Sequence, residues 1–282
     1  MKLFRFGPSG RERPGILDAQ NLRRDASALL PDLSGTYLYP SALAQLRDAD
    51  LKRLPIIGDE VRLGPCVNNV GNFIAVGLNY ADHAAEAGMQ APAEPILFNK
   101  AQSCVSGPND DIVLPRGSSK VDWEVELAIV IGAEASYLAE SDVDTVIAGY
   151  CVCNDVSERG WQLERGGGQW IKGKGCPTFG PLGPYLVTPD EIADVQALPL
   201  WLDLNGEKMQ RGSTATMIFT VRQIVAHVSQ FMLLRPGDVI TTGTPPGVGM
   251  AQKPSRYLRE GDVVTLGIEG LGEQRQRVVA SP

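Results

Sequence analysis

The segment VDWEVELAIVIG, residues 121–132, most constrains the fold of this chain. Apolar and acidic residues alternate over its first half, and its last residues are apolar. Because side chains two apart on a strand share a face, the alternation predicts a strand with Asp122, Glu124 and Glu126 on one face. The apolar run predicts that this strand enters the core, where like charges must be neutralised by protons or by a cation. A solvated acidic face of an antiparallel sheet is the alternative.

A Glu-x-Glu pair on one strand face supplies two hard oxygen ligands, which Mg²⁺, Mn²⁺ and Ca²⁺ prefer. A zinc site is less favoured, because no Cys or His lies in the same run as Glu124 and Glu126. A divalent ion usually takes a third carboxylate. Asp155 is the best candidate, since it ends the next apolar segment, IAGYCVCND, and strand ends commonly line sites.

The chain has only two histidines, His83 and His227. His83 lies in a segment with helical composition, three residues before Glu86, so the two side chains are neighbours on a helix. Glu86 can then orient the imidazole as a general base, and water near a metal can serve as the nucleophile. A chance pair on a surface helix is the alternative. His227 lies among apolar helix residues, and we interpret it as a packed or capping residue.

Polar residues near the predicted carboxylate cluster suggest a bound organic acid. The cationic and amide side chains in this region are Arg159, Gln162, Lys172 and Lys174. Thr242 and Thr244 in TTGTP offer hydroxyl or backbone N–H groups to an oxyanion. Solvated loop charge is the alternative for the lysines. The glycine-rich segments lack the Gly-Lys-Ser/Thr of a phosphate loop and the strand–helix setting of a dinucleotide loop.

The composition narrows the class of protein. A net charge of -7 and a pI near 5.0 argue against a general binder of nucleic acid or anionic membranes. No apolar run approaches eighteen residues and the first ten residues hold no apolar signal region, so we expect a soluble cytoplasmic protein. The five cysteines form no CxxC pair, which favours buried, reduced thiols.

Many short strand signals and few helical ones predict an α+β, β-dominated fold. Residues 1–68 are expected to form a small N-terminal α/β module, and residues 69–282 a catalytic domain. Helices are predicted at 40–55, at 81–89 with an end at Gly88, at 140–150 with Ser141 as a cap, and at 219–235 with Pro236-Gly237 just beyond its end. Asn205-Gly206 predicts a hairpin turn.

Seven segments resemble the fumarylacetoacetate hydrolase family in order, over about residues 69–280. They are GLNYADHAAE, EPILFNK, DWEVELAIVIG, GYCVCNDVSERGWQ, KGKGCPTFGPLGPYLV, FMLLRPGDVITTGTPPGVG and GDVVTLGIEGLGEQRQ. The resemblance implies a mixed β-sandwich roll, a homodimer, and a Mg²⁺ (or Mn²⁺ or Ca²⁺) held by Glu124, Glu126 and Asp155. It also implies a catalytic pair and a set of substrate-binding residues. The pair is His83 and Glu86, and the set is Arg159, Gln162, Lys174 and Thr244.

The family hydrolyses C–C bonds of acylpyruvates, decarboxylates oxaloacetate-like acids, or isomerises related acids. The N-terminal module and the segment ERGGGQWIKGKGCPTFGPLGP resemble the sugar-acid branch of this family. We therefore expect cleavage of a 2,4-diketo-3-deoxy acid of the L-rhamnonate or L-fuconate type to pyruvate and a hydroxy acid. An oxaloacetate or acylpyruvate decarboxylase, a ureidoglycolate lyase and a non-catalytic sugar-acid-binding protein are the alternatives. After Lys174 this chain has Gly175-Cys176-Pro177, where the resemblance leads us to expect Ser-Phe-Asp. The resemblance therefore does not determine the shape of the pocket.

Overall fold

The structure is a computed structural model that describes residues 1–86 and 90–282, without the side chains of residues 83–85. Its largest sheet runs in the order β3-β2-β1-β13-β11-β10-β16-β5-β6, with β4 added to β1 and β7 to β13. These strands are β1 (Lys2–Phe6), β2 (Arg13–Leu17), β3 (Arg23–Asp25), β4 (Leu63–Gly64), β5 (Phe73–Gly77), β6 (Ile96–Lys100), β7 (Val105–Ser106), β10 (Val125–Ile131), β11 (Ile147–Asn154), β13 (Gly180–Val187) and β16 (Val239–Thr241).

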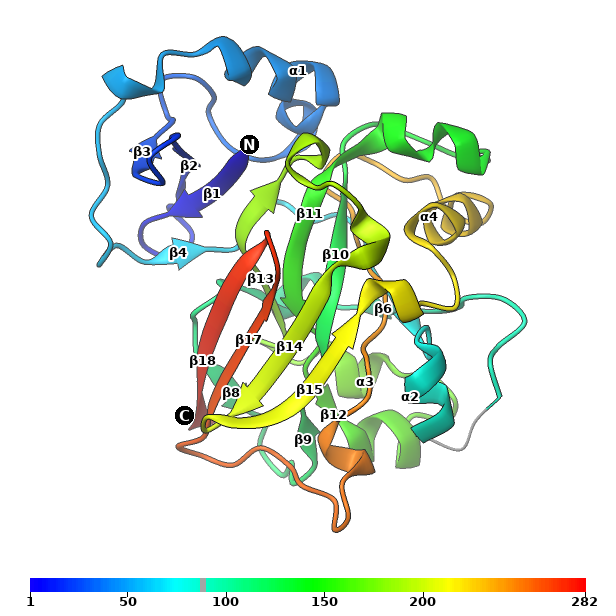
Figure 1. Cartoon of the computed structure of the whole chain (residues 1–282). Coiled ribbons are helices and arrows are strands. Elements are labelled where there is room, and N and C mark those ends of the chain that lie inside the picture. Colours follow the sequence, from blue (N-terminus) through cyan, green and yellow to red (C-terminus); the bar gives the residue numbers. More distant parts are fainter. Residues whose placement is uncertain (87–89) are drawn as a thin grey trace.

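A second sheet packs across the first, and a two-stranded ladder lies apart from both (Figure 1). The second sheet runs in the order β15-β14-β17-β18-β8. Its strands are β8 (Ile112–Leu114), β14 (Pro199–Leu204), β15 (Glu207–Ser213), β17 (Val263–Ile268) and β18 (Gly272–Ala280), and the ladder pairs β9 (Val121–Asp122) with β12 (Ser157–Glu158). Leu127 of one sheet and Leu202 and Leu266 of the other are buried in one core, which confirms the predicted β-dominated sandwich.

The helices are short and lie at the edges of the sheets (Figure 1). They are α1 (Pro40–Gln45), α2 (Ala81–Glu86), α3 (Ile171–Lys174) and α4 (Val221–Ser229). Thr220 and Gln223 form a capping box at the start of α4, which explains why this helix begins where it does. No described helix has the length and apolar character needed to cross a bilayer.

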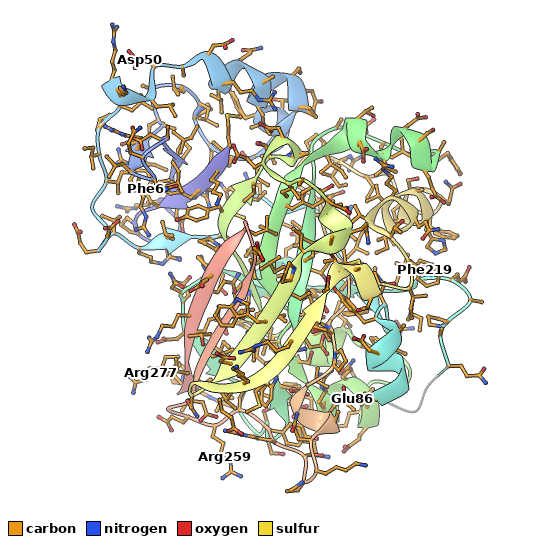
Figure 2. All side chains as sticks on the ribbon, viewed as in Figure 1. Phe6, Asp50, Glu86, Phe219, Arg259 and Arg277 are labelled. Carbon is orange, nitrogen blue, oxygen red and sulfur yellow. The ribbon has the colours of Figure 1, made fainter. Side chains whose placement is uncertain are left out.

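The N-terminal strands continue the large sheet, because β1 pairs with β13 through Lys2 and Val187. A small apolar cluster of its own nevertheless lies within this region and contains Phe4 and Phe6. Figure 2 shows Phe6 among the side chains of this separate group of strands. The N-terminal region is therefore joined to the large sheet by backbone hydrogen bonds while it keeps a local core.

Four predicted elements differ from the structure. The helix expected at 219–235 is only α4, Val221–Ser229, because Leu234 beyond it pairs with Ala135 in an isolated β-bridge. The strand expected over 121–132 is interrupted, since β9 pairs with β12 in the small ladder and only β10 joins the large sheet. The helix expected at 40–55 is only α1 followed by 3₁₀ turns, because few of its residues are buried to support a longer helix. The helix expected at 140–150 is a 3₁₀ segment, Glu140–Val146, whose N-cap is Ala139 rather than Ser141, and the residues that follow pair in β11. The predicted hairpin at Asn205-Gly206 is confirmed by β14 and β15.

Candidate metal and active site

Three carboxylates from two neighbouring strands meet in the interior. Glu124 directly precedes β10, Glu126 is its second residue, and Asp155 follows the end of β11. The antiparallel register places Glu126 opposite Cys153, so the two strand ends lie side by side. One oxygen from each of the three carboxylates lies within 4.8 Å of the others, and all three residues are buried. A divalent cation is the group that this donor set suits.

Buried cationic side chains contact these carboxylates. Nζ of Lys174, on α3, donates to Oε2 of Glu124 at 2.7 Å and to Oδ2 of Asp155 at 2.6 Å. Nζ of Lys100, at the end of β6, donates to the other oxygen of Asp155 and to the carbonyl oxygen of Lys174 at 2.6 Å. Both lysines are almost completely shielded from solvent. Glu124 and Asp155 are thereby held in one orientation by N–H donors, as ligands of a metal usually are.

Arg159 and Asp122 extend the cluster. Nε of Arg159 donates to Oδ2 of Asp122 at 2.8 Å, and Nη2 lies 2.7 Å from Oε1 of Glu124, outside hydrogen-bond geometry. Nη1 donates to Oε1 of Gln162 at 3.1 Å. Sequence reasoning placed Asp122 beside Glu124 and Glu126 on one strand face. The break in that strand instead turns its carboxylate to Arg159.

The charges of the cluster do not balance. The cluster contains four buried carboxylates, including that of Asp122, and three cationic side chains, which pair with Asp122, Glu124 and Asp155 but, within the described residues, not with Glu126. Burial, together with the charges of Asp155 and Glu124, holds the pKa of Glu126 well above its usual value. Burial opposes the charge of Glu124 and so tends to raise its pKa. The positive charges of Lys174 and Arg159 outweigh this effect and hold the pKa of the Glu124 carboxyl below its usual value. Glu126 is therefore the carboxyl whose negative charge the protein itself offsets least, and a divalent cation would stabilise its ionised form.

A cavity of about 590 Å³ opens next to the cluster. Glu124, Glu126, Arg159, Gln162, Lys174, Thr244 and Glu86 line it, so seven of the predicted site residues lie together. One wall is apolar and includes Phe98 and Trp170, whose ring centroids are 5.0 Å apart. The cavity therefore combines a buried polar floor with an aromatic wall, which is typical of sites for small organic molecules.

The threonine hydroxyls are already engaged in hydrogen bonds. Thr244 donates its hydroxyl hydrogen to the carbonyl oxygen of Val125 at 2.8 Å, and Thr242 donates to that of Leu127 at 3.0 Å. Between them, the N–H of Gly243 donates to Oε2 of Glu126 at 3.0 Å. The N–H of Thr242 also donates to the carbonyl oxygen of Leu127, at 3.1 Å, so the choice between hydroxyl and backbone donor for an oxyanion stays open.

The predicted catalytic pair lies on α2. Glu86 lines the cavity, and its two carboxylate oxygens each accept the N–H of Gly247 at 3.2 Å. Figure 2 labels Glu86 at the end of α2 that lies beside the chain following β16. The side chain of His83 lies outside the described residues, although its backbone belongs to α2. His83 as a general base stays a prediction.

Sequence reasoning assigned no role to Lys100, Phe98 or Trp170. The segment EPILFNK carried part of the family resemblance, and a lysine at the end of a predicted strand was the available signal for Lys100. Phe98 and Trp170 come from β6 and from the start of α3, which only the tertiary structure brings together. Their positions could not be inferred from local sequence patterns.

The chain matches known proteins over most or all of its length. Residues 72–279 match the family model described as fumarylacetoacetate (FAA) hydrolase C-terminal. A protein of Burkholderia cenocepacia (strain HI2424), provisionally named a hydrolase, is 60% identical over 278 residues, which cover 98% of each chain.

Solved structures match over 100% of both chains. The structure of maleylpyruvate hydrolase from Sphingobium sp. SYK-6, in complex with manganese(II) ion and pyruvate, is 29% identical with a TM-score of 0.82. That of a probable 2-hydroxyhepta-2,4-diene-1,7-dioate isomerase from Mycobacterium abscessus is 33% identical with a TM-score of 0.84. The similar proteins thus include hydrolases and an isomerase, and this chain belongs to the fumarylacetoacetate hydrolase family.

Proposed function

We propose that this chain is a divalent-metal-dependent hydrolase that cleaves the C3–C4 bond of a 2,4-dioxo acid of the acylpyruvate type. The observation that carries the proposal is the buried group of Glu124, Glu126 and Asp155 beside the cavity. A similar protein, the maleylpyruvate hydrolase, was solved with manganese(II) and pyruvate, a 2-oxo acid. When bound by the three carboxylates, a divalent ion would supply Lewis acidity to the 2-oxo acid end of such a substrate.

The residues of the chain would bind and orient the substrate. Arg159 and Lys174 place cationic N–H groups at the cavity floor, where a carboxylate of the substrate would be attracted. Thr244 and its neighbouring donors would lie near the oxygen that becomes negative when water adds to the C4 carbonyl. His83, three residues before Glu86 on α2, would take the proton from that water.

The reaction balances without a further reactant. Water adds to C4, and the proton it loses goes to His83. The C3–C4 bond breaks, its electron pair stays on C3 of the pyruvate fragment, and C3 then takes up a proton. The products are pyruvate and a carboxylic acid.

Two types of acyl chain, which differ in polarity, are candidates for the substrate. A 2,4-diketo-3-deoxy sugar acid such as the L-rhamnonate derivative would give a hydroxy acid, and the sequence of residues 164–184 supports it. The apolar wall with Phe98 and Trp170 supports an acyl chain with fewer hydroxyl groups. A panel of acylpyruvates that contains both types should therefore be screened.

The test is pyruvate release from this panel by the purified protein, with Mg²⁺ or Mn²⁺ and with EDTA. We expect turnover that EDTA abolishes and that either ion restores. His83→Ala should lower kcat by about 10²–10⁴-fold, the range for a positioned acid–base group. Its controls are an unchanged melting temperature and an unchanged Mn²⁺ affinity. A folded His83→Ala protein that cleaves at the wild-type rate would contradict the assigned base.

Isomerisation is the second candidate function, because a similar protein, 33% identical over the whole chain, is named as an isomerase. Reaction in ¹⁸O-labelled water separates the two. Hydrolysis places one ¹⁸O atom in the carboxylic acid product, whereas isomerisation releases no pyruvate, and decarboxylation releases CO₂ without labelling the remaining acid at C4. The predicted homodimer is a further proposal, which light scattering of the purified protein would test.

A further inference from the structure

The segment after β16 forms one rim of the cavity, and it is held firmly in place. We define residues 247–255 as the rim loop. The carboxylate of Asp122 accepts the N–H of Gly249 at 2.7 Å and that of Met250 at 3.0 Å. The hydroxyl of Ser255 donates to the carbonyl oxygen of Met250 at 3.0 Å, which closes the loop on itself. Since Asp122 also binds Arg159, the rim loop is tied directly to the cluster at the cavity floor.

Lys253 is the cation of the rim loop that lines the cavity. Its side chain is exposed, and within the described part of the chain it makes no ion pair or hydrogen bond. Arg159 and Lys174, the other cations of the wall, are buried and contact the carboxylates of the cluster. Lys253 is therefore the cavity-lining cation that forms no ion pair within the described residues.

The polar groups of the cavity fall into two sets that differ in depth. The floor, with Glu124, Glu126 and Lys174, is buried, whereas Lys253 and Ser255 of the rim loop and Glu86 of α2 are exposed. Apolar residues also line the cavity, among them Phe98, Trp170, Leu163 and Met250. A molecule that fills this cavity would meet charge at the floor, apolar surface along its middle, and the exposed side chains of Lys253 and Glu86 at the mouth.

We propose that Lys253 is a specificity-determining residue that binds a second, distal carboxylate of the substrate, so that the preferred substrates are dicarboxylic acylpyruvates. This inference rests on the proposed function. The 2-oxo acid end would lie at the floor, and the acyl chain along the aromatic wall. The distal carboxylate would accept a charge-assisted hydrogen bond from Lys253 at the mouth.

The test compares maleylpyruvate, which carries a distal carboxylate, with 2,4-dioxopentanoate, which does not. Lys253→Ala should lower kcat/KM for maleylpyruvate about tenfold, mainly through KM, because one charge-assisted hydrogen bond is lost. The value for 2,4-dioxopentanoate should stay within about twofold, as expected where no such bond forms. Lys253→Arg should retain most of the preference. Lys52→Ala, an exposed lysine in the N-terminal region, is the charge-matched control and should change neither value.

Equal losses for both substrates, or no loss for either, would overturn the role of Lys253. If the wild type cleaves neither acid, the proposed function fails by itself. The same comparison is then made on Kd, measured by quenching of tryptophan fluorescence, since Trp170 lines the cavity. Tighter binding of maleylpyruvate that is lost in Lys253→Ala would uphold the inference, and equal affinities in the two proteins would overturn it.

Discussion

The contact between Lys100 and Asp155 allows a quantitative test of how the cluster is held together. Lys100 is fully buried, and its ammonium donates to Asp155 and to the carbonyl oxygens of Lys174 and Val156. Lys100→Met keeps a chain of similar length but removes the charge and all three hydrogen bonds. Removal of one partner from a buried ion pair costs about 3–5 kcal/mol.

Asp155 keeps Lys174 as a second cation in Lys100→Met, so we take the lower end of this range, about 3 kcal/mol. A loss of that size should lower the melting temperature by roughly 6–12 °C for a chain of this length. Asp155→Asn should destabilise by a similar amount. The double variant should be less destabilised than the sum of the two by about 1–3 kcal/mol, because the two residues interact directly.

The assay is urea unfolding of the wild type, both single variants and the double variant, all in EDTA so that metal binding does not contribute. Lys208→Met, at an exposed position of β15, is the matched control and should lie within about 0.5 kcal/mol of the wild type. A Lys100→Met protein as stable as this control would refute the argument. Strict additivity in the double variant would show that the pair does not interact as the contact implies.

Three further predictions concern other parts of the molecule. Glu126→Gln should stabilise the metal-free protein against urea, because burial and the charges of Asp155 and Glu124 oppose the charge that this substitution removes. The same substitution should raise the Kd for Mn²⁺ at least about tenfold, because a metal ligand is lost. A lower stability than the wild type in EDTA would contradict the first expectation. A thiol reagent at pH 8 should label at most Cys176 quickly and all five cysteines in urea, because four are buried and burial raises the pKa of Cys104 to about 11; rapid labelling of several thiols in the native protein would count against it. Gly249→Ala should destabilise by about 1–3 kcal/mol and raise KM, because its Cβ would lie 2.0 Å from the carbonyl oxygen of Arg256 and displace the rim loop; unchanged unfolding and kinetics would argue against the close packing of that loop.

The sequence indicated a large part of the candidate site through local patterns. The two-residue period placed Glu124 and Glu126 on one side of the chain, and the apolar run after them indicated their burial. The same period wrongly added Asp122, because it cannot register a break between two strands that belong to different sheets. The side chain of His83 lies outside the described residues, so its role as a general base remains a prediction from the sequence.

By itself, the sequence determined which residues share a face of a strand, where the hairpin at Asn205-Gly206 turns, and that the strand bearing Glu126 runs into an apolar interior. These properties depend on neighbours within a few positions along the chain, so a single sequence contains them. Only the tertiary structure decided that Asp155 adjoins Glu126, that Lys100 reaches Asp155, and that the rim loop places Lys253 at the cavity mouth. Those contacts depend on strand register and on packing between segments 19 to 128 positions apart, such as Lys174 with Asp155 and Met250 with Asp122, which no local pattern encodes.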